Sequence, residues 1–118
     1  TRNVPGSPNI PDVIANKIDN SFCFIGDVTI INKDSKKPSP NPNVMFETGY
    51  ALSSLGDKRL IVICNTHYGK FEALPFDIKI RRIMQYELAR NSLQKEKDEK
   101  KEKLISCLYD ALKAISNL

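Results

Sequence analysis

The sequence predicts an α/β fold, a three-layer sandwich in which helices cover both faces of a parallel sheet. Two stretches, 21–29 and 59–65, are short and mostly apolar, as are strands buried in a parallel sheet. Segments with the apolar spacing of helices precede, separate and follow them. Because right-handed crossovers join such alternating elements, the strands are expected to run parallel, with ligands bound at their carboxyl ends.

The first helix is expected from Ile10 to about Asn20, after an opening loop rich in proline and glycine. Its apolar residues fall on one stripe, which indicates one buried face. The stretch 21–29 then predicts a strand that is covered on both faces and carries Asp27 near its end.

A polar segment, 32–43, separates this strand from the second helix. Prolines at alternate positions within it exclude both a helix and a central strand. Asn43 is expected to cap the second helix, and Gly56 to end it in the left-handed conformation that glycine adopts most easily. Five residues share one face of this helix: Val44, Thr48, Ala51, Leu52 and Leu55.

The remaining elements are two strands and a long helix. Residues 59–65 give the clearest buried strand, and a shorter strand is expected near 82–86. The last helix is expected from about Asn91. Its apolar stripe appears late, at Leu104, Ile105, Leu108, Leu112 and Ile115.

Length and composition bound the domain organisation. The 118 residues suit one domain, and a hydrophobic fraction of 41% is enough for a core. Three strands are fewer than the ~5 or 6 of an average sheet. We therefore expect residues 1–118 to form a single domain that lacks its first strand and helix and belongs to a longer protein.

Charge and cysteine content exclude several function classes. The net charge is +4, but the run 95–103 mixes both signs like a solvated helix face, so nucleic-acid binding is not expected. With no membrane-spanning apolar run and no signal core, the chain is expected in the cytoplasm, away from membranes. Cys23, Cys64 and Cys107 are spaced like buried, reduced thiols rather than zinc ligands.

Glu47 is the strongest candidate for chemistry. It lies one turn inside the second helix and one helical turn after Asn43, at the end that faces the predicted crevice. It flanks the apolar stripe, so partial burial at the pocket wall is expected. Backbone amides and the helix dipole favour a charged carboxylate there. The alternative is an ordinary surface acid in the first turn of a helix.

Other polar residues admit two interpretations each. Asp27 can bind a ribose hydroxyl or simply form a turn. Asn41 and Asn43 fit loop and cap positions that would orient Glu47. Arg82 can bind a phosphate or lie on a solvated edge strand.

Two further side chains are interpreted as structural. His67 lies in a loop without the acidic or cysteine neighbours of a metal site. Cys64 has no evident base partner and is expected to be a buried thiol rather than a nucleophile. The glycines form no Gly-x-Gly-x-x-Gly run, which argues against a Rossmann dehydrogenase.

Three blocks in the middle of the chain form a recognisable pattern. They are Asp27-Val28-Thr29, Asn41-Pro42-Asn43-Val44 and Glu47-Thr48-Gly49-Tyr50-Ala51-Leu52. Together they resemble the TIR-like nucleotide-binding domains of bacterial defence proteins, and the wider pattern is similar to nucleoside deoxyribosyltransferases. Further matches are Val4 to Ile10, Leu74-Pro75-Phe76-Asp77, Arg81, Arg82 and Tyr86. The resemblance extends to about residue 90 and does not cover the final helix.

The resemblance implies a flavodoxin-like sheet and cleavage of an N-glycosidic bond, most often the bond between nicotinamide and ribose in NAD. Glu47 is then the catalytic residue, NAD is the substrate and no cofactor is needed. The implied substrate-binding residues are Asp27, Thr29, Asn41, Asn43, Tyr50 and Arg82. Cleavage builds oxocarbenium-like charge on the ribose, which a fixed carboxylate beneath the sugar stabilises.

Three functions stay open. The first is an NAD glycohydrolase, the effector domain of anti-phage signalling, switched on by a sensor domain elsewhere in the protein or by self-association through TIR-like contacts. The second is a nucleoside or nucleotide glycosyl hydrolase or deoxyribosyltransferase that uses the same glutamate. The third is a noncatalytic module that binds a nucleotide or assembles through the segment from Val4 to Ile10.

Overall fold

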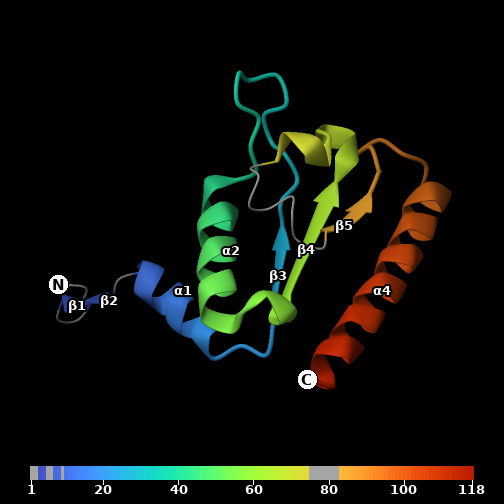
Figure 1. Ribbon diagram of the computed structural model, residues 1–118. Helices are drawn as coiled ribbons and strands as arrows, with labels where there is room; N and C mark the ends of the chain where they lie inside the picture. The colour runs from blue at the N-terminus through green and yellow to red at the C-terminus, as the bar shows by residue number, and fades with distance from the viewer. Residues whose placement is uncertain (1–2, 5–6, 9, 75–82) are drawn as a thin grey trace.

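The protein is represented by a computed structural model, which describes residues 3–4, 7–8, 10–74 and 83–118. Figure 1 shows three layers, with α1 and α2 on one side of a sheet and α4 on the other. The elements are β1 (Asn3–Val4), β2 (Ser7–Pro8), α1 (Ile10–Asp19), β3 (Phe24–Asp27), α2 (Pro42–Leu55), β4 (Leu60–Asn65), β5 (Ile83–Tyr86) and α4 (Gln94–Ser116).

The sheet is parallel, with the order β3-β4-β5. Phe24 pairs with Leu60, and Val62 in turn pairs with Ile83. Each crossover between neighbouring strands passes through a helix or a long connection, as parallel pairing requires. The predicted α/β class with a parallel sheet is therefore confirmed.

The core lies between the sheet and the layer formed by α1 and α2. Side chains alternate along a strand, so every second residue of β4 points toward α2. These residues pack against the buried faces of α1 and α2 and against the connections that follow β3 and β4. The buried cluster consists of Ile18, Val28, Ile30, Ala51, Leu60, Val62, Cys64 and Leu74.

The first strand of the sheet is shorter and less covered than expected. β3 begins at Phe24 rather than Ser21, and the prediction that both of its faces are buried is wrong. Ile25 is 45% exposed, and Phe22 just before the strand is 51% exposed. The physical reason is that α4 packs against β5, so it leaves the outer face of β3 uncovered.

The second helix begins two residues earlier than expected. Asn41, not Asn43, is the N-cap: its Oδ1 accepts hydrogen bonds from the backbone N–H groups of Asn43 (2.8 Å) and Val44 (3.4 Å). Pro42 then occupies the first turn, where a missing N–H costs nothing. The expected end at Gly56 is confirmed, since this residue has a φ of 86°.

The last helix, α4, begins at Gln94 rather than at about Asn91, and it presents its apolar residues differently from the prediction. Leu104, Leu108 and Leu112 are half-buried and Ile115 is buried, whereas Ile105 is 54% exposed and does not belong to the packed stripe. Ile105 falls one residue beyond the stripe, and this rotation turns it toward solvent. Cys107 is also exposed, so the prediction that all three thiols are buried is wrong.

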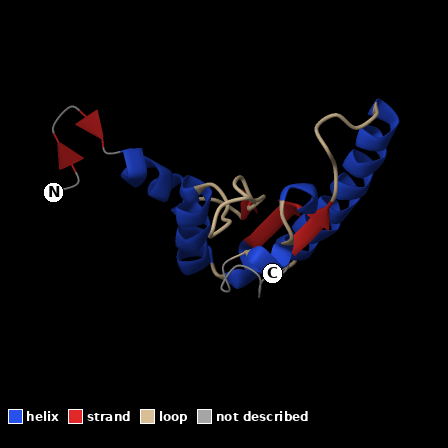
Figure 2. Ribbon diagram, turned by 90° about the horizontal axis from the view of Figure 1, so that it is seen from above, coloured by secondary structure: helices blue, strands red, loops and turns tan. Residues whose placement is uncertain are grey.

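β1 and β2 lie apart from the three-stranded sheet (Figure 2). β1 and β2 form an antiparallel pair in which Val4 lies opposite Ser7. The role of the segment from Val4 to Ile10 in assembly stays a prediction. Within the described ranges, no helix is both long and apolar enough to cross a membrane.

Candidate active site

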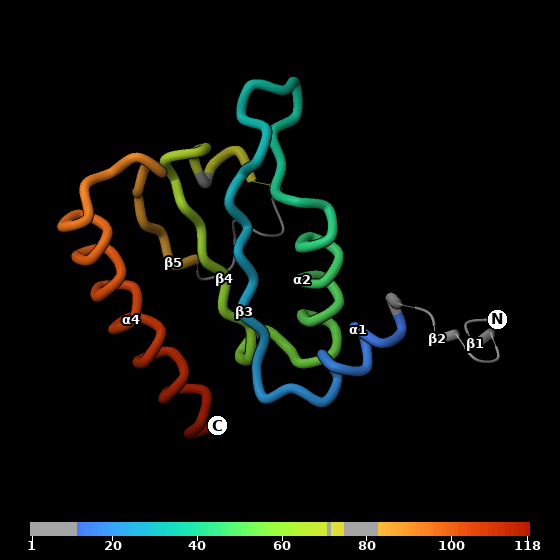
Figure 3. Tube along the Cα trace, turned by 180° about the vertical axis from the view of Figure 1, so that it is seen from behind, coloured from blue at the N-terminus to red at the C-terminus, as the bar shows by residue number. Residues whose placement is uncertain are grey.

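The carboxyl ends of the three parallel strands lie at the same edge of the sheet. Figure 3 shows the connection from β3 to α2 projecting above this edge before α2 begins. Ile30 and Pro40 form a bridge at the base of the projection, and both are almost fully buried. Ile31 N–H donates to the Ser39 carbonyl at 3.1 Å and so closes the base further. The closed base brings the amino end of α2 to the carboxyl ends of the strands.

Glu47 lies beside the carboxyl end of β3. The next residue, Thr48, packs its hydroxyl against Gly26, the penultimate residue of that strand. Glu47 itself is half-buried, which confirms the expected partial burial. Its carboxylate forms no hydrogen bond or ion pair with any residue that the structure describes. The carboxylate is therefore not committed to a structural contact there.

Asp27 is held by Thr29. Both the hydroxyl of Thr29 (2.6 Å) and its backbone N–H (3.0 Å) donate to Oδ1 of Asp27. The same hydroxyl accepts a hydrogen bond from the backbone N–H of Asn65 at 2.9 Å. Two residues predicted to bind substrate thus form one network across the ends of β3 and β4.

Asn65 extends this network to the end of β5, and the sequence interpretation gave it no role. Its amide donates to the Leu88 carbonyl (2.8 Å), while its Oδ1 accepts from the N–H groups of Leu88 (3.1 Å) and His67 (3.2 Å). The residue is only 8% exposed. The available signal was its position at the end of a buried strand, the same position that drew attention to Asp27.

Asp27 and α2, the helix that carries Glu47, lie on opposite faces of the sheet. Gly26 faces α2, and neighbouring residues of a strand point to opposite sides, so Asp27 points toward the α4 side. Asp27 is exposed there, paired in register with Ile63. Because Asp27 and α2 lie on opposite faces, a ligand that contacts both passes over the end of β3.

A comparison with known protein families identifies the kind of domain to which this candidate site belongs. A family model described as the TIR domain of the CAP12/Pycsar effector protein matches residues 4–87. The chain belongs to this family of bacterial defence TIR domains. The resemblance predicted from the central blocks is confirmed. Searches of curated proteins and of solved structures found no significant match.

The family match contains the candidate active site of this TIR domain and ends just after β5. It therefore includes Glu47 and the network of Asp27, Thr29 and Asn65, whereas α4 lies outside it. The end of the match before α4 agrees with the sequence pattern, because the blocks that carry the resemblance also lie before the last helix.

The other predicted site residues of the TIR domain lie in different surroundings. Asn41 caps α2, and Asn43 lies in its exposed first turn, one turn before Glu47. The Tyr50 hydroxyl lies 2.9 Å from both carboxylate oxygens of Asp19, in a contact between α1 and α2. The substrate-binding roles of these residues stay predictions.

Some predicted residues lie away from the site, and others are not among the residues that the structure describes. Arg82 lies outside the described residues, as do Arg81 and the Pro75-Phe76-Asp77 match. His67 is exposed, and its ring packs edge-on against Tyr68. In the described ranges, no three His, Cys, Asp or Glu side chains are grouped so that they could hold a metal ion.

The surroundings of two titratable groups near the edge raise their pKa values. Burial raises the pKa of the Cys64 thiol, and the negative charge of Asp27 raises it further. Burial likewise raises the pKa of the Tyr86 hydroxyl, with the Asp27 carboxylate as the next cause. A thiol that stays protonated is a poor nucleophile, which supports a structural role for Cys64.

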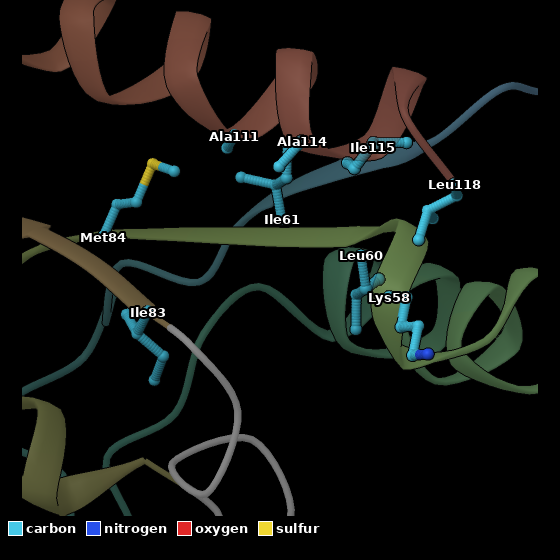
Figure 4. Close-up of a pocket in the computed structure, with 9 residues that line it drawn as sticks. All are labelled: Lys58, Leu60, Ile61, Ile83, Met84, Ala111, Ala114, Ile115 and Leu118. Atoms are coloured by element: carbon cyan, nitrogen blue, oxygen red, sulfur yellow. The ribbon is translucent and has the colours of Figure 1, made fainter.

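A separate cavity of about 550 Å³ lies between α4 and the sheet (Figure 4). Its walls are mainly apolar and include Ile61, Met84 and Ala114. Leu60 at the beginning of β4 and Leu118 at the chain end also line it, so it reaches the amino ends of the strands. This cavity lies on the sheet face opposite α2 and is not the candidate active site.

Proposed function

We propose that this TIR domain is an NAD+ glycohydrolase that acts as an effector in anti-phage signalling. The observation that carries the proposal is the placement of Glu47, half-buried beside the carboxyl end of β3. Parallel α/β sheets bind ligands at this edge, and a carboxylate there is suited to a substrate that develops positive charge. The family supports a defence role for the domain.

The proposed reaction breaks the bond between the ribose carbon and the nicotinamide nitrogen. The bonding electrons pass to the nitrogen, nicotinamide leaves as a neutral molecule, and positive charge develops on the ribose. Water then forms the new carbon–oxygen bond and releases a proton, so the products are nicotinamide and ADP-ribose. Because nicotinamide leaves without needing a proton, one carboxylate can supply the main catalytic effect. Glu47 supplies it either through charge stabilisation or through a transient bond to the ribose.

The network of Asp27 and Thr29 is proposed to bind a sugar hydroxyl. Thr29 donates twice to Oδ1 of Asp27, and no described residue donates to Oδ2. Since Asp27 is exposed, Oδ2 can accept from a hydroxyl of the ligand. Asn43 is exposed one turn before Glu47 and is proposed to contact the same substrate.

Activation is proposed to depend on assembly. In this view a sensor domain elsewhere in the full-length protein controls self-association of the TIR domain, and self-association completes the pocket around NAD+. Cytoplasmic location follows from the substrate as part of the same proposal. We propose that β1 and β2, which stand clear of the sheet, take part in such contacts (Figure 2).

The test compares the full-length wild-type protein with Glu47→Gln, which keeps the size of the side chain and removes its charge. Nicotinamide and ADP-ribose are quantified after incubation with NAD+, and a panel of nucleosides is assayed in parallel. We expect release of both products by the wild type and loss of release in the variant. Release of a free base from a nucleoside alone would instead favour the second function. Nucleotide binding without turnover in both proteins would favour a noncatalytic module.

A further inference from the structure

β3 and α2 are packed more closely than any side chain on Gly26 would permit. Gly26 is buried, and a Cβ built at this position would lie 2.8 Å from Oγ1 of Thr48. It would also lie 2.9 Å from the ring of Phe24. Both distances are well below van der Waals contact, so a methyl group there must displace something. The Phe24 ring is the end of a longer side chain, whereas the Thr48 hydroxyl is one bond from a helical Cβ.

The partner in this contact is itself unusual. Thr48 is 1% exposed, and its hydroxyl is buried without a hydrogen-bond partner among the described residues. Alanine at this position would avoid burying an unsatisfied hydroxyl. The threonine therefore contributes shape rather than a hydrogen bond, because its hydroxyl occupies the space that the missing side chain of Gly26 leaves.

Glu47 is covalently linked to this contact. It precedes Thr48 in α2, so any shift of the helix away from β3 moves both residues together. We propose that Gly26 and Thr48 are positioning residues that set the depth of the Glu47 carboxylate beneath the ribose of the substrate. This inference rests on the proposed function, because it needs a reaction at Glu47. A misplacement of about 1 Å in an active site can reduce turnover on the order of 100-fold.

The experiment measures kcat and KM for NAD+ in the full-length protein, corrected for the folded fraction. Gly26→Ala is expected to lower kcat by roughly 10- to 100-fold with a change in KM below about 3-fold. Thr48→Ala in the same chain removes the opposing hydroxyl. The double variant is therefore expected to regain the kcat of Thr48→Ala to within about 3-fold, the signature of a direct contact. Thr48→Ser keeps Oγ1 and is expected to retain the wild-type kcat.

Gly49→Ala is the matched control for stability. It adds the same methyl group to α2, but no atom lies within 4 Å of the new Cβ, so the melting temperature should not fall. A purely structural role for Gly26 would lower the melting temperature of Gly26→Ala and leave kcat per folded molecule unchanged. That result would overturn the proposal, as would a loss of kcat that Thr48→Ala does not rescue. If the wild type itself turns over NAD+ no faster than Glu47→Gln, the proposed function fails, and the positioning role fails with it.

Discussion

The hydroxyl of Tyr50 lies 2.9 Å from each carboxylate oxygen of Asp19. Tyr50 lies in the middle of α2, and Asp19 is the last residue of α1. This contact therefore joins the two helices that form one layer. Ser54, one turn later in α2, donates to the same carboxylate. One acid thus fixes the angle at which α1 meets the helix that carries Glu47.

Tyr50→Phe is expected to lower the free energy of unfolding by about 1 kcal/mol, because the charged acceptor loses a donor at a half-exposed site. Urea denaturation of the single variants and of the combination with Asp19→Ala measures the coupling. The two effects are expected to be less than additive. Full additivity would show that the contact between Tyr50 and Asp19 contributes nothing to stability.

Substitutions at Asn41 and Asn43 distinguish the cap of α2 from its first turn. Asn41→Ala removes the oxygen that accepts from two backbone N–H groups and is expected to cost about 1 kcal/mol of stability. Asn43→Ala, at an exposed helical position, is expected to change stability by less than about 0.5 kcal/mol. Thermal or chemical denaturation gives both values. Equal costs at the two positions would contradict the cap assignment.

The error at this helix start shows which parts of the fold the sequence can determine. Three features were correctly predicted from the pattern of apolar residues and glycine: the parallel strands, the burial of Thr48 and Ala51 on one face of α2, and the end of α2 at Gly56. The cap was misassigned because Asn41 and Asn43 have the same local preference, and only the position of Pro42 in the first turn separates them. The exposed face of Ile25 was missed because coverage depends on where α4 lies, which is a tertiary property.

Thr29 is expected to stabilise the edge through its hydroxyl, which bonds to both Asp27 and Asn65. Thr29→Val keeps the shape and removes both bonds, and about 1 to 2 kcal/mol of unfolding free energy should be lost. Thr29→Ser keeps the hydroxyl and is the control, with a loss below about 1 kcal/mol. Chemical denaturation measures both variants. A valine variant as stable as the serine variant would mean that the network does not support the edge.

The raised pKa of Cys64 predicts a pH dependence of stability. The unfolded thiol ionises near pH 8.5, whereas the folded thiol ionises at higher pH because it is buried and lies near Asp27. The folded state therefore holds the proton more tightly, and the free energy of unfolding falls as pH rises above about 8.5. Denaturation between pH about 8 and 10 should show a shallower fall for Cys64→Ala. An identical slope in both proteins would contradict the prediction.

The place of the candidate site in the fold was predictable, but its geometry only in part. Glu47 could be located because a helix that follows a strand and a long loop begins at the carboxyl edge of the sheet. Its relation to Asp27 was not predictable, since the face on which a strand residue points depends on register. Asn65 and Gly26 were missed because their roles arise from contacts between segments far apart in the chain.

We propose above that the carboxylate of Glu47 promotes loss of nicotinamide from NAD+. The most direct measurement is kcat/KM for nicotinamide release by the full-length protein and by Glu47→Gln at equal folded concentration. We expect Glu47→Gln to lower kcat/KM by at least about 1000-fold, equivalent to about 4 kcal/mol of transition-state stabilisation. A Glu47→Gln protein that releases nicotinamide at the wild-type rate would contradict it.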